Sequence, residues 1–214
     1  MIPDGRFWTF GGLTDASPVG VNQPTAELLP HNGAPVPVPL LLQTDQQNLY
    51  PFAYIIPGDS NRAVSTLWLY CGVRSQLLNI VTLAFVAELP QLASGTGHRS
   101  YPLYGSSVML PVSTDQYNNP LPAEILICGG GSGFLITDPA LDNCGRTTPS
   151  LGAGAIWTLE QMPIRRVLPD LITLPDGNVL IINGAGNGGG GFNAASVPIR
   201  TAVLYDPRKV KCVI

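Results

Sequence analysis

Positive charge is scarce in this sequence, and lysine is confined to its end. The 214 residues contain 11 lysines and arginines against 14 acidic residues, for a net charge of −3. A chain with this balance has no strongly basic face to neutralise phosphates, which argues against nucleic acid as a partner. Both lysines, Lys209 and Lys211, lie among the last six residues. We therefore expect one domain over 1–207 and a tail, 208–214, that does not belong to it.

Long apolar segments and targeting signals are also absent. The longest apolar stretch, Leu77–Ala87, is too short for a helix that crosses a bilayer, so we expect no membrane span. The first residues show no basic region followed by an apolar core, so we expect no signal peptide within this sequence. No Asn-x-Ser/Thr sequon occurs, so the residues themselves give no evidence of glycosylation.

Only four cysteines are present, and none lies in a Cys-x-x-Cys or Cys/His pattern of zinc spacing. Cys71 and Cys128 end apolar runs at equivalent positions, which favours two buried thiols that pack as small apolar groups. Alternatively, Cys128 and Cys144 form a disulfide that closes the loop between them, as would suit a secreted protein. The sequence does not decide between these readings.

Two other features suggest chemistry but support a plain interpretation. The only histidines, His31 and His98, each lie alone in a polar loop. Imidazole binds copper, but isolated histidines of this kind are interpreted as exposed loop residues. The glycine-rich segment Gly184–Gly191 lacks a Gly-Lys-Ser/Thr motif, and Pro198 and another strand follow it instead of a helix. We interpret it as a flexible strand connection.

Glycine and proline, in contrast, are abundant, with 24 and 21 residues placed between short apolar runs. A phrase made of a turn, a β-forming run and a glycine occurs four times and closes at Gly12, Gly72, Gly130 and Gly184. The intervals are 60, 58 and 54 residues. A repeat of this length built from short strands is typical of propeller blades. The predicted fold class is all-β, a partial kelch-type β-propeller of about four blades.

The apolar runs predict strands and no helix, because no pattern of period 3.6 persists beyond two turns. The expected strands are 6–10 and 22–30; 54–56, 65–71 and one or two within 77–87; 107–111, 123–128, 134–137 and 157–163; and 170–174, 178–183 and 200–207.

Several of these segments resemble the fungal and plant glyoxal oxidases. The similar stretches, in the family's order, are Arg99–Pro111, Ala123–Gly130, Asn143–Arg146, Met162–Asp170 and Leu174–Ala185. The resemblance implies a seven-bladed propeller similar to that of galactose oxidase, and a secreted protein. It also implies one copper ion with a cross-linked tyrosine–cysteine radical cofactor. Such a site oxidises small aldehydes to carboxylic acids and reduces O2 to H2O2.

None of the family's copper ligands or cofactor residues maps onto this chain, so we expect it to bind no copper by itself. We expect it to be an inactive piece of a larger oxidase that arose from an incomplete gene model. Tyr101, Tyr104, Arg166 and Asp170 precede inner strands and are candidates for the central channel. Alternatively, Arg166 and Asp170 pair structurally. Two other functions stay open: a non-catalytic kelch-like binding propeller, and a short binding paralogue.

Overall fold

The computed structural model describes residues 2, 4–13, 21–30, 33–44, 47–60, 63–92, 97–191, 193–209 and 211–213. Nearly all regular structure within them is β-strand, so the all-β prediction is confirmed. The described strands form three sheets of four strands, one of three strands and a two-stranded hairpin. Two short helices, α1 (Pro39–Gln43) and the 3₁₀ helix η1 (Pro149–Gly154), connect strands. No helix in the described part could span a membrane.

The four larger sheets are antiparallel, and in each the first strand of the sequence lies at an edge. They are sheet 1, β1 (Phe7–Phe10), β2 (Thr25–Leu29) and β3 (Val36–Pro37); sheet 2, β4 (Phe52–Ile56), β5 (Thr66–Cys71), β6 (Arg74–Asn79) and β7 (Phe85–Glu88); sheet 3, β8 (Gly105–Met109), β9 (Ile125–Gly129), β10 (Asn143–Thr147) and β11 (Thr158–Gln161); and sheet 4, β12 (Asp170–Thr173), β13 (Val179–Ile182), β16 (Val203–Asp206) and β17 (Lys211–Val213). The hairpin is β14 (Ala185–Gly188) with β15 (Ala195–Pro198).

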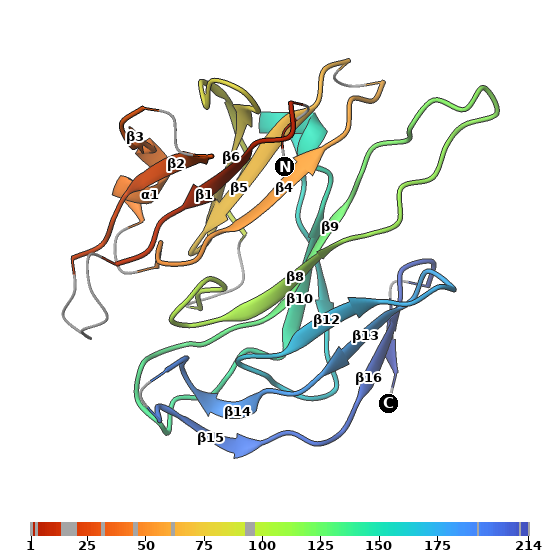
Figure 1. Ribbon diagram of the computed structural model, residues 1–214. Helices are drawn as coiled ribbons and strands as arrows, with labels where there is room; N and C mark the ends of the chain where they lie inside the picture. The colour runs from red at the N-terminus through yellow and green to blue at the C-terminus, as the bar shows by residue number, and fades with distance from the viewer. Residues whose placement is uncertain are drawn as a thin grey trace.

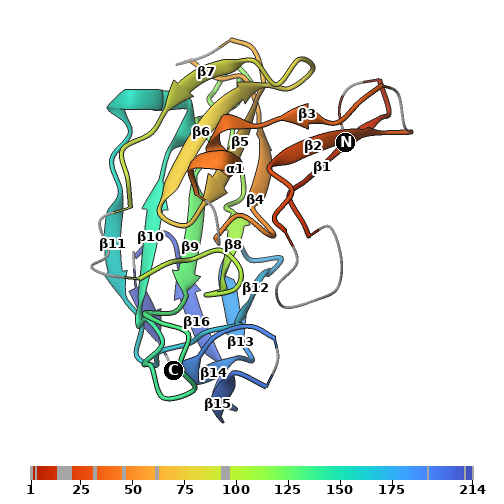
Figure 2. The ribbon, with the colours of Figure 1, turned by 90° about the vertical axis from the view of Figure 1, so that its left-hand side faces the viewer.

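The edge strands β4, β8 and β12 run in the same general direction (Figure 1). Figure 2 shows β11, β10, β9 and β8 in this order across the molecule, with sheet 2 and sheet 4 on either side. Because sheets 2, 3 and 4 begin at the corresponding edge, the segments that precede β4, β8 and β12 gather at one end of the molecule. This arrangement places the candidate residues.

The hydrophobic core consists of three apolar layers between successive sheets. Side chains alternate along a strand, so β5 contributes Leu67 and Leu69 to the layer against sheet 1 and Trp68 and Tyr70 to the layer against sheet 3. In the same way, Leu126 of β9 packs towards sheet 4. Central strands covered on both faces read as unbroken apolar runs, which explains why these strands were the easiest to predict.

Several local predictions differ from the structure. Residues 134–137, expected to be a strand, form a turn, and the partner of β9 is instead β10 at Asn143–Thr147. The short helix α1 was not expected; its buried Leu40 and Leu41 pack between sheet 1 and sheet 2, so tertiary contacts stabilise it rather than a helical pattern. The glycine-rich segment is not a simple connection, because Ala185–Gly188 forms β14.

The expected tail also contributes to the fold. Lys211–Val213 lies within 208–214, yet it forms β17 and pairs antiparallel with β16. Composition set this segment apart, but strand pairing depends on backbone hydrogen bonds, which composition does not report. His31 lies outside the described residues.

Candidate functional site

Three similar tetrapeptides stand just before the edge strands β4, β8 and β12, and the second is separated from β8 by Leu103 and Tyr104. They are Asn48–Pro51, Arg99–Pro102 and Arg166–Pro169, and we call them the upstream motifs. The end of the molecule that they form is called the upstream face. The third motif is joined to the segment that follows the second motif, because the Leu168 amide donates to the Tyr104 carbonyl at 2.7 Å. Strands β8 and β12 are also in contact.

The arginine of the second motif holds sheet 3 together from inside. Its guanidinium is fully buried and donates to the carbonyl oxygens of Gly129, at 2.5 Å, and Asn143, at 2.9 Å. It also donates to the Asn143 side-chain oxygen. Burial lowers the pKa of Arg99 to about 10. The charge therefore remains at neutral pH and fixes the ends of β9 and β10 relative to the upstream motif.

Arg166 has the same role one sheet further on. Its buried guanidinium donates to the carbonyl of Asn183, at 2.8 Å, and to that of Thr201. Burial lowers the pKa of Arg166. Asp170 is exposed and accepts a 2.7 Å hydrogen bond from the Asn183 side chain. Arg166 and Asp170 are thus linked through Asn183, and the ion pairs of the described residues do not include them.

Glycine is required at the point where sheet 4 meets its own upstream motif. All four glycines that close the repeats have positive φ, at 105° for Gly12, 63° for Gly72, 123° for Gly130 and 93° for Gly184. At Gly184, a Cβ atom would lie 2.5 Å from the carbonyl oxygen of Val167. All four glycines therefore serve a left-handed backbone, and Gly184 also allows the close approach of two chain segments.

The two candidate tyrosines lie on different parts of the upstream face. The half-buried Tyr101 contacts the ring of Tyr50 edge-on, with 5.0 Å between centroids, and covers Gly190 in the glycine-rich segment. Tyr104 is half-buried too, and its pKa is raised first by burial and then by the negative charge of Asp170. The structure thus brings Tyr104 and Asp170 close together, while the Arg166 side chain turns inwards.

The sequence did not lead us to predict that Arg99 holds the ends of β9 and β10, or that Asn183 connects Arg166 with Asp170. A signal was present, because Arg99-Ser-Tyr-Pro102 and Arg166-Val-Leu-Pro169 share arginine and proline at the same spacing. Each arginine reaches the residue that ends the second strand of its sheet, or the residue just beyond it. Aligning the repeats on these motifs rather than on their glycines would have indicated equivalent positions.

The described residues do not fit a copper ion. Copper is held by imidazole, thiolate or carboxylate groups, and no three such side chains gather anywhere in the described ranges. His98 is not an exposed loop residue as expected, because it is half-buried and burial lowers its pKa. Its backbone pairs with Gly131. No catalytic step through a metal is therefore derived for these residues.

Cys128 and Cys144 are joined by a disulfide across β9 and β10, where they are directly opposed and their Cα atoms lie 4.0 Å apart. Cys71 is a free buried thiol, and burial raises its pKa to about 12. Cys212 is free as well. The favoured interpretation of two buried thiols therefore holds for Cys71 but is wrong for Cys128, which forms the alternative disulfide with Cys144.

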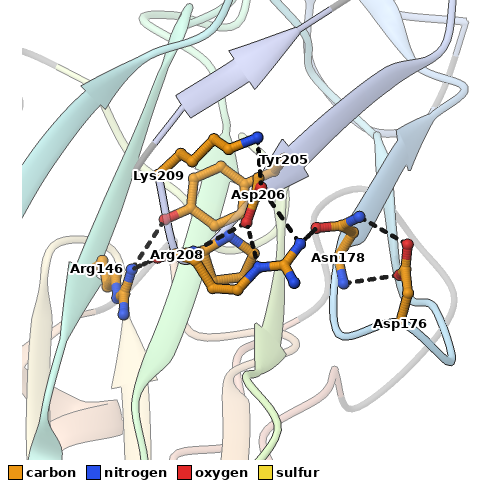
Figure 3. Close-up of polar contacts among 8 residues, drawn as sticks. Arg146, Asp176, Asn178, Tyr205, Asp206, Arg208 and Lys209 are labelled. Carbon is orange, nitrogen blue, oxygen red and sulfur yellow. Dashed lines mark hydrogen bonds and ion pairs between the residues drawn. The ribbon is translucent and has the colours of Figure 1, made fainter.

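A second polar cluster lies at the opposite end of sheets 3 and 4. Arg146 donates to Glu124 and to the Pro207 carbonyl, and the Tyr205 hydroxyl donates to Glu160 at 2.9 Å. Figure 3 shows Arg146 and Tyr205 beside the turn that holds Arg208 and Lys209. A polar cleft of about 320 Å³ adjoins Arg146 and Glu160. These contacts connect sheet 3 to β16 of sheet 4 and to the turn that follows it, and they are remote from the upstream face.

Comparison with known proteins identifies the family. Residues 1–212 match the family model described as the glyoxal oxidase N-terminus. The chain belongs to the glyoxal oxidase family. The resemblance read from the sequence motifs is thereby confirmed. Glyoxal oxidases and the related alcohol oxidases are copper radical oxidases.

The chain is similar to several longer proteins. It is 39% identical to a WSC domain-containing protein of Arthroderma benhamiae, over 97% of this chain and 21% of that protein. It is 36% identical to an aldehyde oxidase of Arabidopsis thaliana, over 97% of this chain and 34% of that protein. An aldehyde oxidase of Vitis pseudoreticulata is 34% identical, over 98% of this chain and 38% of the relative. The chain thus spans about a fifth to two fifths of these curated relatives.

A solved structure shows the same fold. It is a fungal alcohol oxidase of the AA5 family in complex with copper, with a TM-score of 0.64 and 17% identity. The superposition covers 98% of this chain and 41% of that chain. At this level of identity the likeness concerns the fold.

Proposed function

We propose that this chain is part of a secreted copper radical oxidase that oxidises small aldehydes to carboxylic acids and reduces O2 to H2O2. The observation that carries the proposal is the match over nearly the whole chain to two aldehyde oxidases, at 36% and 34% identity. Sheets 1 to 4 are then four kelch-type blades, in residues 1–207 and β17, of the seven-bladed ring that the family resemblance implies. The disulfide supports secretion, because such bonds persist in oxidising compartments.

In this proposal the upstream face borders the central channel. Tyr104 and Asp170 present polar groups there, and Tyr101 lies over the glycine-rich segment. Arg99 and Arg166 take no direct part and instead hold the strand ends that carry these groups. Fixed hydroxyl and carboxylate groups in such a channel would orient a small carbonyl substrate before it reaches the metal.

The copper ligands are proposed to come from residues other than the described ones. We expect the 214-residue chain alone to release no peroxide with methylglyoxal, and a longer protein that contains it to bind copper and release peroxide. Peroxide from the chain alone would contradict this division of the site. A longer protein that binds no copper and releases no peroxide would favour a kelch-like binding propeller.

The channel role has its own test in that longer protein. Tyr104→Phe and Asp170→Asn should raise the KM for methylglyoxal more than they lower kcat, since they orient the substrate without touching the metal. Tyr117→Phe is the matched control, because Tyr117 lies 75% exposed in the loop after β8, at the other end of that strand. If Tyr104→Phe and Tyr117→Phe change KM and kcat to the same extent, the upstream face does not border the channel.

A further inference from the structure

Glu160 has one carboxylate oxygen that the fold leaves without a partner. The residue lies on β11 and is only 8% exposed. Its Oε1 accepts a hydrogen bond from the Tyr205 hydroxyl at 2.9 Å, whereas the buried Oε2 has no hydrogen-bond partner among the described residues. A buried carboxylate oxygen normally accepts a hydrogen bond, because removing it from water is costly. Oε2 therefore marks a place where a donor from another molecule fits.

Glu160 lines the polar cleft of about 320 Å³ described above, which we call the Glu160 cleft. Its size lies within the range of sites that bind small ligands. The other side chains with charged or hydroxyl groups that line it are Glu124, Arg146, Thr148 and Thr158. Leu151 and Ile156 line it as well, and they are 45% and 76% exposed. The cleft thus combines carboxylate and hydroxyl groups with exposed aliphatic side chains.

The charges at the Glu160 cleft favour a cationic ligand. Among the described residues, Arg146 is the only cation that lines the cleft. Its Nε and Nη2 donate to Glu124, and its Nη1 donates to the Pro207 carbonyl at 2.8 Å and to the Tyr205 hydroxyl at 3.4 Å (Figure 3). The ion pairs between described residues do not include Glu160. An anion would therefore meet two carboxylates and an engaged guanidinium, whereas a cation would find an unpaired carboxylate.

The acceptors of the cleft fit a primary ammonium better than other cations. An ammonium is a compact charge with three donors, so one can bond to Glu160 Oε2 while the others reach the hydroxyls of Thr148 and Thr158. A guanidinium needs two adjacent acceptors for its planar fork, and Oε1 is already bonded to Tyr205. A metal ion fits poorly, because three ligating side chains do not gather anywhere in the described ranges.

We propose that the Glu160 cleft binds a primary alkylammonium group. The ammonium donates to Glu160 Oε2, and its alkyl chain lies against Leu151 and Ile156. Because Oε2 is shielded from bulk water, the ammonium displaces the exposed Ile156 side chain as it enters. The group belongs either to a free aliphatic diamine or to a lysine side chain of another protein. The site goes beyond the proposed function and needs no copper, since the cleft is remote from the upstream face.

Nuclear magnetic resonance of the 214-residue chain, with labelled leucine, isoleucine and valine methyl groups, tests the site. Putrescine, an aliphatic diamine, is the probe, and butanediol of the same length is its uncharged control. A short peptide with one lysine, compared with its Nε-acetylated form, represents the protein source. Glu160→Gln removes the charge and keeps an acceptor for Tyr205. Glu88→Gln is the matched control, because Glu88 is also a carboxylate near an arginine, Arg74, but lies on β7 of sheet 2.

We expect putrescine to shift the methyl signals of Leu151 and Ile156. The signals of Val197, which is exposed on β15 of the other hairpin, should stay unchanged. Glu160→Gln should weaken binding about tenfold or more and Glu88→Gln less than about twofold, because only Glu160 offers a charged acceptor in the cleft. Butanediol and the acetylated peptide should cause no shift. Tighter binding of the lysine peptide than of putrescine would assign the cleft to a partner protein, and the reverse order to a free diamine.

Three results would overturn the ammonium site. They are equal binding of putrescine and butanediol, unchanged affinity in Glu160→Gln, and the absence of methyl shifts with both amines, in which case water alone satisfies Oε2. Urea denaturation checks that each variant is folded, and the methyl shifts of the starting chain do not depend on any variant. Failure of this site would leave the proposed oxidase function intact, because that function is tested separately by copper binding and peroxide release.

Discussion

Replacing Arg99 by lysine tests whether the buried guanidinium holds the upstream face in place. Arg99 donates to Gly129 and Asn143 through a planar fork that spans two strand ends. Lysine keeps the charge but concentrates it at one point, so it cannot reach all the acceptors. We expect at least one hydrogen bond to be lost and one buried carbonyl to be left without a partner.

The structure sets the size of this effect. A hydrogen bond to a charged group contributes about 1.5–3 kcal/mol, and a buried unpaired acceptor costs about 1–3 kcal/mol. Local relaxation should recover part of the lost hydrogen-bond energy and part of the cost of the unpaired carbonyl. We therefore expect Arg99→Lys to lower the free energy of unfolding by about 2–4 kcal/mol.

Urea denaturation followed by tryptophan fluorescence measures this change, and the slope of free energy against urea should stay constant. Arg6→Lys is the matched control. The Arg6 side chain bonds to Asp4 in an exposed turn, so its substitution should have a much smaller effect. If Arg99→Lys and Arg6→Lys unfold at the same urea concentration, the buried Arg99 guanidinium does not stabilise the fold, which would contradict its role in holding the upstream face in place.

Three other changes have defined outcomes. Replacing both Cys128 and Cys144 by alanine should lower the free energy of unfolding in urea by about 3 kcal/mol, because their bond closes a loop with a sequence separation of 16; reductant should not destabilise the double variant further. Gly184→Ala should lower the melting temperature much more than Gly5→Ala, since both have positive φ but a Cβ meets a carbonyl only at Gly184; equal losses would contradict the close approach. Burial raises the pKa of Glu160 above 4.5, so the folded state binds this proton more tightly and stability falls as pH rises from 4.5 through the higher folded value. Glu160→Gln should flatten that part of the stability–pH curve, and an unchanged curve would contradict a raised pKa of Glu160 in the folded state.

Much of the fold is local and was predictable from residue patterns. Runs such as Thr66–Cys71 and Ile125–Gly129 are apolar throughout, because each lies in the middle of a sheet with a neighbour on both faces. The repeated glycines marked the ends of such strands correctly, since only glycine accepts a positive φ in close contact with another segment. The family was legible for the same reason, as its motifs are short and contiguous.

Other parts depended on partners distant in the chain. Strand β10 contains Asn143, Cys144 and Gly145, a poor β-forming sequence, and it exists because β9 and β11 pair with it on both sides. The tail strand β17 likewise forms by pairing with β16. In both cases backbone hydrogen bonds to a neighbour outweigh the preferences of the side chains.

The residues of the upstream face show the same difference between features set by the local sequence and features set by tertiary contacts. The order of residues alone places Tyr101, Tyr104 and Arg166 shortly before an edge strand and Asp170 at the start of one. Folding then separated their roles, since Arg166 turns inwards to two carbonyls while Asp170 remains in solvent. Arg99 bridges residues 30 and 44 positions away, a contact that no short pattern encodes. The buried Arg99 guanidinium reaches its carbonyl acceptors only after the strands that carry them have paired and packed.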